Sequence, residues 1–276
     1  MLYLNGQPVP VTIFPDKTSQ VWKLPQEFFA QSKTTAHVLW TFEHEGEFMH
    51  LAQLTELTDR CRLGPRFSST TLELKYLPYG RQDKVVANST TFALRTFAKL
   101  VNGLGFMKVI IHDPHSEVAL ELIANSSAVY PTQQLANVLN ETGATIVCYP
   151  DKGAVAKYTK VYRELVGSAH MYGEKVRDQL TGNITSYKIV GNPHAERVLI
   201  VDDICDGGMT FKLLAKDLLA AGAESVVLFV THGIFSKGLQ TLKDSGIQRI
   251  YTQDGEAVED WIDGHSGIKQ ITYRRL

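Results

Sequence analysis

Four short apolar segments recur along the chain, and each ends in acidic, histidine, proline or glycine residues. They span residues 108–115 (KVIIHDPH), 144–153 (ATIVCYPDKG), 197–203 (RVLIVDD) and 224–233 (ESVVLFVTHG). Segments of helical periodicity separate them, and this alternation is typical of βαβ units. The pattern therefore predicts an α/β fold in which mostly parallel sheets are flanked by helices.

Two of the segments between these runs have the spacing of helices that cover a sheet. Residues 89–103 begin with hydroxyl residues that suit a helix N-cap, and they end at a glycine. The apolar side chains on one face of this segment are Phe92, Phe97, Leu100 and Val101. Residues 209–222 repeat apolar side chains at helical spacing, starting from Phe211. Both segments are predicted to be helices packed against a sheet.

The region before residue 87 is different, because it is richer in short alternating runs. Residues 10–25 (PVTIFPDKTSQVWKLP) predict a hairpin. A boundary at residues 126–131 (SSAVYP) divides the chain into two units of similar size. We therefore expect an N-terminal domain over residues 1–128 and a C-terminal domain over residues 129–276.

The composition argues against several classes of protein. The formal net charge of −1 leaves no basic excess to replace the counterions of nucleic acid, so we expect no nucleic-acid partner. Cys61, Cys148 and Cys205 lie far apart, which argues against a zinc site or a disulfide framework and favours a reducing, cytoplasmic setting. The chain has no apolar run of about 18 residues and no leader-like start, so we expect no membrane association.

Residues 197–211 join a buried strand to a cluster of acidic and glycine residues. Ligands of parallel sheets bind beyond the carboxyl ends of the strands, where the next helix presents free N–H groups. The residues at this place are Asp202, Asp203, Asp206, Gly207, Gly208, Met209 and Thr210. The glycines allow an anion to approach the backbone, whereas adjacent aspartates favour sugar hydroxyls or a hydrated divalent cation. The alternative is that Asp202 and Asp203 only end a strand and cap a helix.

The run VLIVDDICDGGMT resembles the phosphoribosyl-binding motif of type I phosphoribosyltransferase folds. A second segment, residues 76–85 (YLPYGRQDKV), resembles the Pro-Tyr-x-x-Arg-Gln-Asp segment of the ribose-phosphate pyrophosphokinase family. This resemblance implies that Arg81 and Gln82 contact ATP. A guanidinium suits phosphate or an adenine face, and a glutamine amide can pair with an adenine edge.

Three further segments follow in the order of that family. His115 in HDPHS is similar to its magnesium-associated histidine, and Asp151 in PDKG is similar to a metal- and ribose-associated aspartate. Lys175 and Arg177 in YGEKVRDQ resemble the two cations of its catalytic loop, which would stabilise the charge of the transferring group. Without the resemblance, His115 would be read as a structural histidine, and the two cations as solvated side chains.

The resemblance implies a fold of two phosphoribosyltransferase-like domains, the first binding the nucleotide and the second the ribose phosphate. It also implies an activity, in which diphosphate passes from ATP to the C1 hydroxyl of ribose 5-phosphate to give phosphoribosyl pyrophosphate and AMP. ATP would be the co-substrate and Mg²⁺ the cofactor. Family members form homo-oligomers, either dimers or hexamers.

The sequence departs from the family pattern at two places. The helix that usually precedes the Phe-x-Asp-x-Glu loop has no counterpart; in the loop Asp16 is kept, but Thr18 replaces an adenine-contacting glutamate. In the phosphate motif, Gly207 replaces a threonine and Met209 a glycine, so a hydroxyl donor is lost and space is gained. A phosphodiester needs fewer donors than a terminal phosphate, so ADP-ribose is an alternative acceptor.

Two other classes of function remain as alternatives. A phosphoribosyltransferase that consumes phosphoribosyl pyrophosphate would need the sugar-phosphate motif but not Arg81, Gln82 or Lys175. A non-catalytic regulatory homologue would bind partner subunits without turnover. The joint presence of the candidate cations, His115 and the aspartates argues for catalysis.

Overall fold

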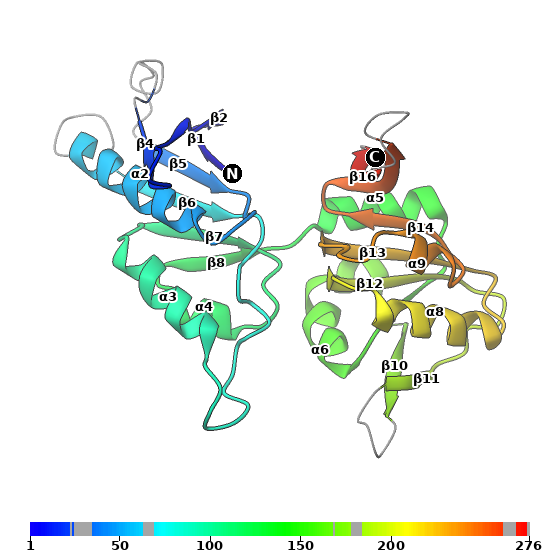
Figure 1. Cartoon of the computed structure of the whole chain (residues 1–276). Helices are drawn as coiled ribbons and strands as arrows, with labels where there is room; N and C mark the ends of the chain where they lie inside the picture. The colour runs from blue at the N-terminus through cyan, green and yellow to red at the C-terminus, as the bar shows by residue number, and fades with distance from the viewer. Residues whose placement is uncertain are drawn as a thin grey trace. The chain divides into compact units, whose positions relative to one another are not determined.

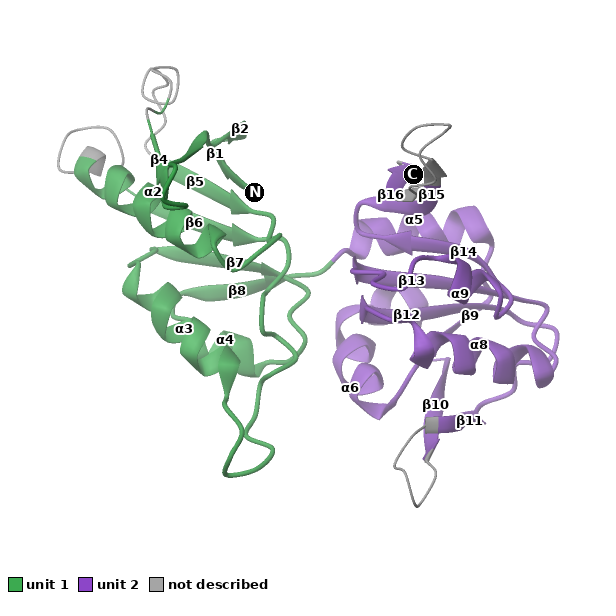
Figure 2. Ribbon diagram, in the orientation of Figure 1, with its two compact units in different colours: residues 1–130 green, residues 131–276 purple. Residues whose placement is uncertain are grey.

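The structure is a computed structural model that describes residues 1–22, 24, 35–62, 69–167, 169–177, 184–261 and 269–274. For residues 61, 62, 177, 184, 260, 261, 269 and 270 it describes the backbone only. The chain divides into two compact units, Met1–Tyr130 (unit 1) and Pro131–Leu276 (unit 2) (Figure 2). Each unit has its own sheet with helices packed against it (Figure 1).

Unit 1 has a six-stranded sheet with the strand order β2-β1-β5-β6-β7-β8 and a separate pair, β3 and β4. The strands are β1 (Leu2–Leu4), β2 (Gln7–Pro8), β3 (Val11–Ile13), β4 (Ser19–Val21), β5 (Thr35–Trp40), β6 (Ser69–Leu74), β7 (Lys108–His112) and β8 (Ser126–Val129). The helices in the described ranges are α2 (Glu47–Arg62), α3 (Ala93–Gly103) and α4 (Val118–Leu122). Strands β5 to β8 run parallel, and β1 joins β5 antiparallel.

One face of the unit 1 sheet forms a hydrophobic core. Side chains in β5 and β6 alternate between half-buried and buried, which is the period of a strand with one face packed. Helices α2 and α3 cover the buried face with Leu51, Leu54, Leu94 and Phe97. The opposite face carries a charged cluster in which Glu73 accepts hydrogen bonds from two histidines.

Unit 2 has an eight-stranded sheet with the strand order β11-β10-β9-β12-β13-β14-β15-β16. Its strands are β9 (Ile146–Tyr149), β10 (His170–Arg177), β11 (Ile184–Val190), β12 (Arg197–Cys205), β13 (Ser225–Gly233), β14 (Ile247–Thr252), β15 (Gly255–Trp261) and β16 (Lys269–Arg274). Its helices in the described ranges are α5 (Thr132–Thr142), α6 (Lys152–Val161), α7 (Arg163–Val166), α8 (Met209–Ala220) and α9 (Gln240–Lys243).

The central strands of unit 2 are parallel and buried on both faces. Strands β10, β9, β12, β13 and β14 run parallel, and the outer strands are antiparallel. Most residues of β12 and β13 are buried and the others are half-buried, as expected for a sheet covered by helices on both sides. Helix α8 contributes Phe211, Leu214 and Leu218 to the core, and burying each such side chain stabilises the fold by roughly 1.5–3 kcal/mol.

The sequence-based prediction of α/β architecture is confirmed. The four apolar segments form β7, β9, β12 and β13, and α8 begins at Met209. The predicted hairpin is the antiparallel pair of β3 and β4. None of the helices in the described ranges is long and apolar enough to cross a bilayer.

The prediction for residues 89–103 was wrong in two details. Helix α3 begins at Ala93, after Phe92 at the N-cap, so the preceding hydroxyl residues do not cap it. Leu100 was expected on the buried face, yet its side chain is 51% exposed. The buried stripe is formed by Leu94, Phe97, Ala98 and Val101, and Leu100 lies at the rim of a pocket between α2 and α3.

Candidate functional site

In unit 2, Asp151 and Lys175 form an ion pair at the carboxyl end of β9. Asp151 is the N-cap of α6, where its Oδ1 atom accepts a hydrogen bond from the Ala154 N–H at 3.0 Å. The Lys175 Nζ atom, on β10, donates to Asp151 Oδ2 at 2.7 Å. Burial tends to raise the pKa of Asp151, but the hydrogen bonds from Lys175 and Ala154 lower it overall. Two residues predicted from separate motifs are thus brought together.

The neighbouring strand β12 presents Asp202 and Asp203 beside this pair. Burial, together with the charge of Asp203, raises the pKa of Asp202 well above its usual range. A carboxyl group can accept hydrogen bonds from sugar hydroxyls. The Asp203 side chain is buried, and its Oδ2 atom lies 3.9 Å from the Lys157 Nζ atom. The carboxyl edge of the unit 2 sheet therefore combines carboxyl groups with two lysines, Lys157 and Lys175.

Residues 206–208 form a tight loop between β12 and α8, and Met209 and Thr210 begin the helix. Gly208 occupies the left-handed region, with φ 76° and ψ 0°, at the N-cap of α8. The N-cap residue Gly208 has no side chain that could accept hydrogen bonds from the first N–H groups of α8, which suits the approach of an anion. The side chain of Met209 is 54% exposed, and Thr210 is half-buried. This geometry is compatible with the predicted anion-binding loop, and the segment 206–210 is called the anion-binding loop below.

Sequence reasoning missed two lysines at this edge of unit 2. A Cβ atom added to Gly207 would lie 3.6 Å from the methylene carbons of Lys237, an exposed residue in the loop that follows β13. Lys157 lies on α6, on the helix that Asp151 caps. The sequence offered a signal for each of them. Lys157 follows the PDKG motif at helical spacing, and Lys237 follows the carboxyl end of a predicted strand.

In unit 1, the loops after β6 and β7 bring Arg81, Gln82 and His115 close together. A Cβ atom added to Gly80 would lie 3.8 Å from the Cβ atom of His115. The next residue, Ser116, donates to Asp83 Oδ2 at 2.7 Å. All three predicted residues are exposed at this edge. They are therefore accessible to a ligand.

Of the two remaining predicted residues, Asp16 lies in a separate turn and the side chain of Arg177 is not described. Asp16 lies in the turn between β3 and β4, where its Oδ1 atom accepts hydrogen bonds from the Thr18 N–H and hydroxyl at 3.0 and 2.7 Å. In the described residues, Asp16 makes no hydrogen bond or ion pair with the Arg81 loop. Arg177 is the last residue of β10, and its side chain lies outside the described part of the chain.

The acidic groups fit a metal ion that enters with its substrate. Among the described side chains, no three of the histidine, cysteine, aspartate and glutamate residues gather to hold an ion by themselves. Magnesium is commonly held by one or two carboxylates together with substrate phosphates and water. Asp151, at the carboxyl edge of unit 2, and His115, at that of unit 1, are compatible with such an ion.

Comparisons with known proteins give a consistent result. No family model matches the chain. The ribose-phosphate pyrophosphokinase of Pyrococcus abyssi is 29% identical over 174 residues, which cover 62% of this chain and 60% of the relative. That of Aeropyrum pernix is 27% identical over 64% of this chain and 59% of its own length. That of Pyrococcus furiosus is 28% identical over 72% of this chain and 70% of its own length.

The chain thus matches about three fifths of the length of the first two relatives. A crystal structure of phosphoribosylpyrophosphate synthetase from Mycobacterium smegmatis superposes with a TM-score of 0.64 at 22% identity, covering 75% of this chain and 67% of that one. This likeness confirms the predicted fold of two phosphoribosyltransferase-like domains. The resemblance seen in the motifs is confirmed as well, since the chain is similar to curated ribose-phosphate pyrophosphokinases at 27–29% identity.

Proposed function

We propose that the protein transfers diphosphate from ATP to the C1 hydroxyl of a ribose 5-phosphate group. The observation that carries this proposal is the anion-binding loop before α8, which lies in the same unit as the Lys175–Asp151 ion pair. The similarity to ribose-phosphate pyrophosphokinases supports the reaction type. Unit 2 would bind the ribose phosphate, and the Arg81 loop of unit 1 would contact the nucleotide.

In this reaction the C1 oxygen forms a bond to the β-phosphorus of ATP. The bond from that phosphorus to the oxygen bridging to the α-phosphate breaks, AMP leaves with the electron pair, and the hydroxyl proton is lost. Negative charge spreads over the transferred phosphate oxygens, so the Lys175 ammonium would stabilise the transition state. Asp202, beside Asp203 on β12, would orient the ribose hydroxyls.

We propose magnesium as the cofactor, carried with ATP. Bound Mg²⁺ would withdraw charge from the phosphate oxygens. Asp151 and His115 are the residues that the resemblance associates with this ion. Both have the exposure this requires, since the Asp151 side chain is 39% exposed and His115 is exposed.

A larger acceptor such as ADP-ribose is a second candidate, and the anion-binding loop favours it. The space beside Gly207 is bounded by the exposed Lys237, and Met209 leaves its side chain in solvent. The 5-phosphate of ADP-ribose continues into a second phosphate, which needs room and a further cation. Lys237 is placed to supply that charge.

The test is identification of the products formed from Mg-ATP with ribose 5-phosphate or ADP-ribose, by mass spectrometry. We expect AMP together with an acceptor whose mass has increased by one diphosphate group. A Lys237→Ala variant should lose more activity with ADP-ribose than with ribose 5-phosphate if the larger acceptor is correct. Formation of AMP with neither acceptor would favour a non-catalytic homologue and would overturn the proposal.

A further inference from the structure

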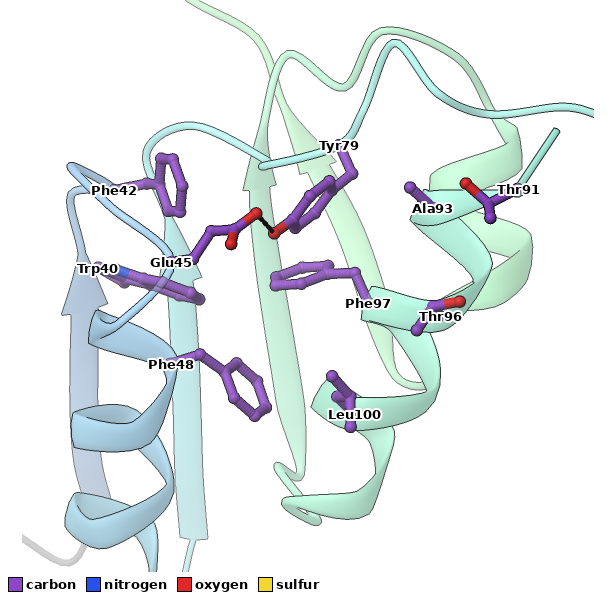
Figure 3. Close-up of a pocket in the computed structure, with 10 residues that line it drawn as sticks. All are labelled: Trp40, Phe42, Glu45, Phe48, Tyr79, Thr91, Ala93, Thr96, Phe97 and Leu100. Atoms are coloured by element: carbon purple, nitrogen blue, oxygen red, sulfur yellow. Dashed lines mark hydrogen bonds between the residues drawn. The ribbon is translucent and has the colours of Figure 1, made fainter.

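Unit 1 contains an aromatic pocket that no predicted residue explained. It has a volume of about 430 Å³, within the range of roughly 300–1,000 Å³ for small-molecule sites. The residues that line it are Trp40, Phe42, Glu45, Phe48, Tyr79, Thr91, Ala93, Thr96, Phe97 and Leu100 (Figure 3). It lies between α2 and α3, beyond the carboxyl ends of β5 and β6, where parallel sheets bind ligands.

The pocket has a fixed aromatic floor. Trp40 and Phe97 are almost fully buried, and their ring centroids lie 6.1 Å apart. The indole N–H of Trp40 donates to Glu47 Oε2 at 2.9 Å, which holds the ring in place. Phe48 and Tyr79 pack against Phe97 with centroid distances of 6.2 and 5.5 Å. These are the distances of packed aromatic pairs, so a planar ligand is expected to lie against the ring cluster rather than between its rings.

One charged group faces this apolar surface. The Tyr79 hydroxyl donates to Glu45 Oε1 at 2.5 Å (Figure 3). That hydrogen bond, with burial, raises the pKa of Tyr79 to about 12, so the hydroxyl remains a donor. Among the described residues, Tyr79 is the only hydrogen-bond partner of the Glu45 side chain. The second carboxylate oxygen can therefore accept an N–H group from a ligand.

We propose that this pocket binds the adenine of the nucleotide donor, with Glu45 accepting a hydrogen bond from the exocyclic amine. A flat ring system with one amino group matches an aromatic floor with one acceptor. The position is also suitable, because Tyr79 lies in the turn that continues directly to Arg81 and Gln82. This inference rests on the proposed function and names the nucleotide subsite within it.

The pocket also accounts for a departure from the family pattern. Position 18 carries threonine where the relatives' motif has an adenine-contacting glutamate, and Thr18 is bonded to Asp16 in its own turn. Glu45 supplies a carboxylate from a different element, the segment before α2. The adenine contact would thus have moved from the β3–β4 turn to the pocket.

The test measures binding of Mg-ATP and of purine riboside 5′-triphosphate, which lacks the amine, by titration calorimetry. The wild type should bind ATP about tenfold more tightly than the analogue, since a hydrogen bond to a charged group contributes about 1.5–3 kcal/mol. Glu45→Ala should abolish this preference. Glu43→Ala is the matched control, because Glu43 is an exposed neighbour that does not line the pocket.

A second pair of variants tests the cavity without touching the carboxylate. Thr96 lines the pocket from an exposed position on α3, so Thr96→Trp should fill it and weaken ATP binding at least about tenfold. Lys99 is exposed on the same helix but does not line the pocket, and Lys99→Trp should bind ATP like the wild type.

The outcomes separate the two proposals. If the wild type binds ATP but Glu45→Ala and Thr96→Trp bind it equally well, the adenine lies elsewhere, and only this inference fails. If GTP binds more tightly than ATP, the assignment to adenine is also wrong. If the wild type binds no nucleotide, the proposed function fails together with it.

Discussion

Substitution by alanine should affect the stability of unit 2 differently at the two adjacent glycines of the anion-binding loop. Gly208 has φ 76°, and a Cβ atom there would lie 2.9 Å from Leu242 Cδ2, a side chain that is 1% exposed. The atoms nearest to a Cβ atom on Gly207 would be Lys237 methylenes, at 3.6 Å, and the φ of Gly207 lies outside the left-handed region. We therefore expect Gly208→Ala to destabilise unit 2 and Gly207→Ala to leave its stability unchanged.

The magnitude for Gly208→Ala follows from these contacts. A left-handed conformation costs a non-glycine residue roughly 1–2 kcal/mol. Displacing buried Leu242 from its rotamer adds about 0.5–1.5 kcal/mol. The reduced freedom of the unfolded chain offsets about 0.4–1 kcal/mol of this. The net loss of unfolding free energy is therefore about 2 kcal/mol, while Gly207→Ala should stay within about 0.5 kcal/mol.

Hydrogen exchange of the β12 and β13 amides, followed by mass spectrometry, measures the effect within unit 2. A loss of about 2 kcal/mol reduces protection by roughly 30-fold. Gly207→Ala should keep its protection but bind the ribose phosphate more weakly, because the methyl group blocks approach of the anion. Equal loss of protection in the two variants, or a change below about threefold in Gly208→Ala, would refute this reasoning.

Three further predictions address the remaining groups. Lys175→Ala should lower ATP-to-AMP turnover about 10²–10³-fold while ATP binding persists; unchanged turnover would show that Lys175 faces no transferring group. Burial raises the pKa of Glu73, but hydrogen bonds from His112 and His37 lower it below 4.5 overall. The ionised Glu73 therefore stabilises the folded protein above pH 4.5, and this stabilisation is lost as the pH falls through the lowered pKa. Urea unfolding from about pH 6 to 3 should show a weaker acid dependence in Glu73→Gln, and parallel curves would contradict this. In the described structure the buried Tyr149 hydroxyl has no hydrogen-bond partner, so Tyr149→Phe should raise the unfolding free energy by about 1 kcal/mol in the same assay, and a decrease would reveal a hidden partner.

The central strands and α8 could be predicted because local patterns determine them. The run from Arg197 to Cys205 is apolar enough to be buried on both faces, and α8 carries its core residues at helical spacing. The antiparallel addition of β1 to β5 could not be predicted in the same way. Strand β1 has only three residues, and its partner was fixed by contacts distant in sequence.

The candidate site was predictable where a motif carried it, and not where folding created it. Asp151 and Lys175 came from separate motifs, and their ion pair is the direct result of β9 and β10 lying side by side. The proximity of Lys237 to Gly207 depends on how two loops pack. The pocket beside Glu45 likewise needs rings from three elements, and a sequence pattern does not encode such a distance.

The ion pair between Lys175 and Asp151 also helps to hold strand β10 in place. Residues 170–172 pair with β9, whereas the part that carries Lys175 continues as a two-stranded arm with β11. Two ion pairs, Lys175 to Asp151 and Glu174 to Lys152, fasten this arm to the start of α6. A sugar hydroxyl or cation that bound the Asp151 carboxylate would compete with Lys175 for it. If such a ligand displaced Lys175, the ammonium group would be free to contact a phosphate bound nearby.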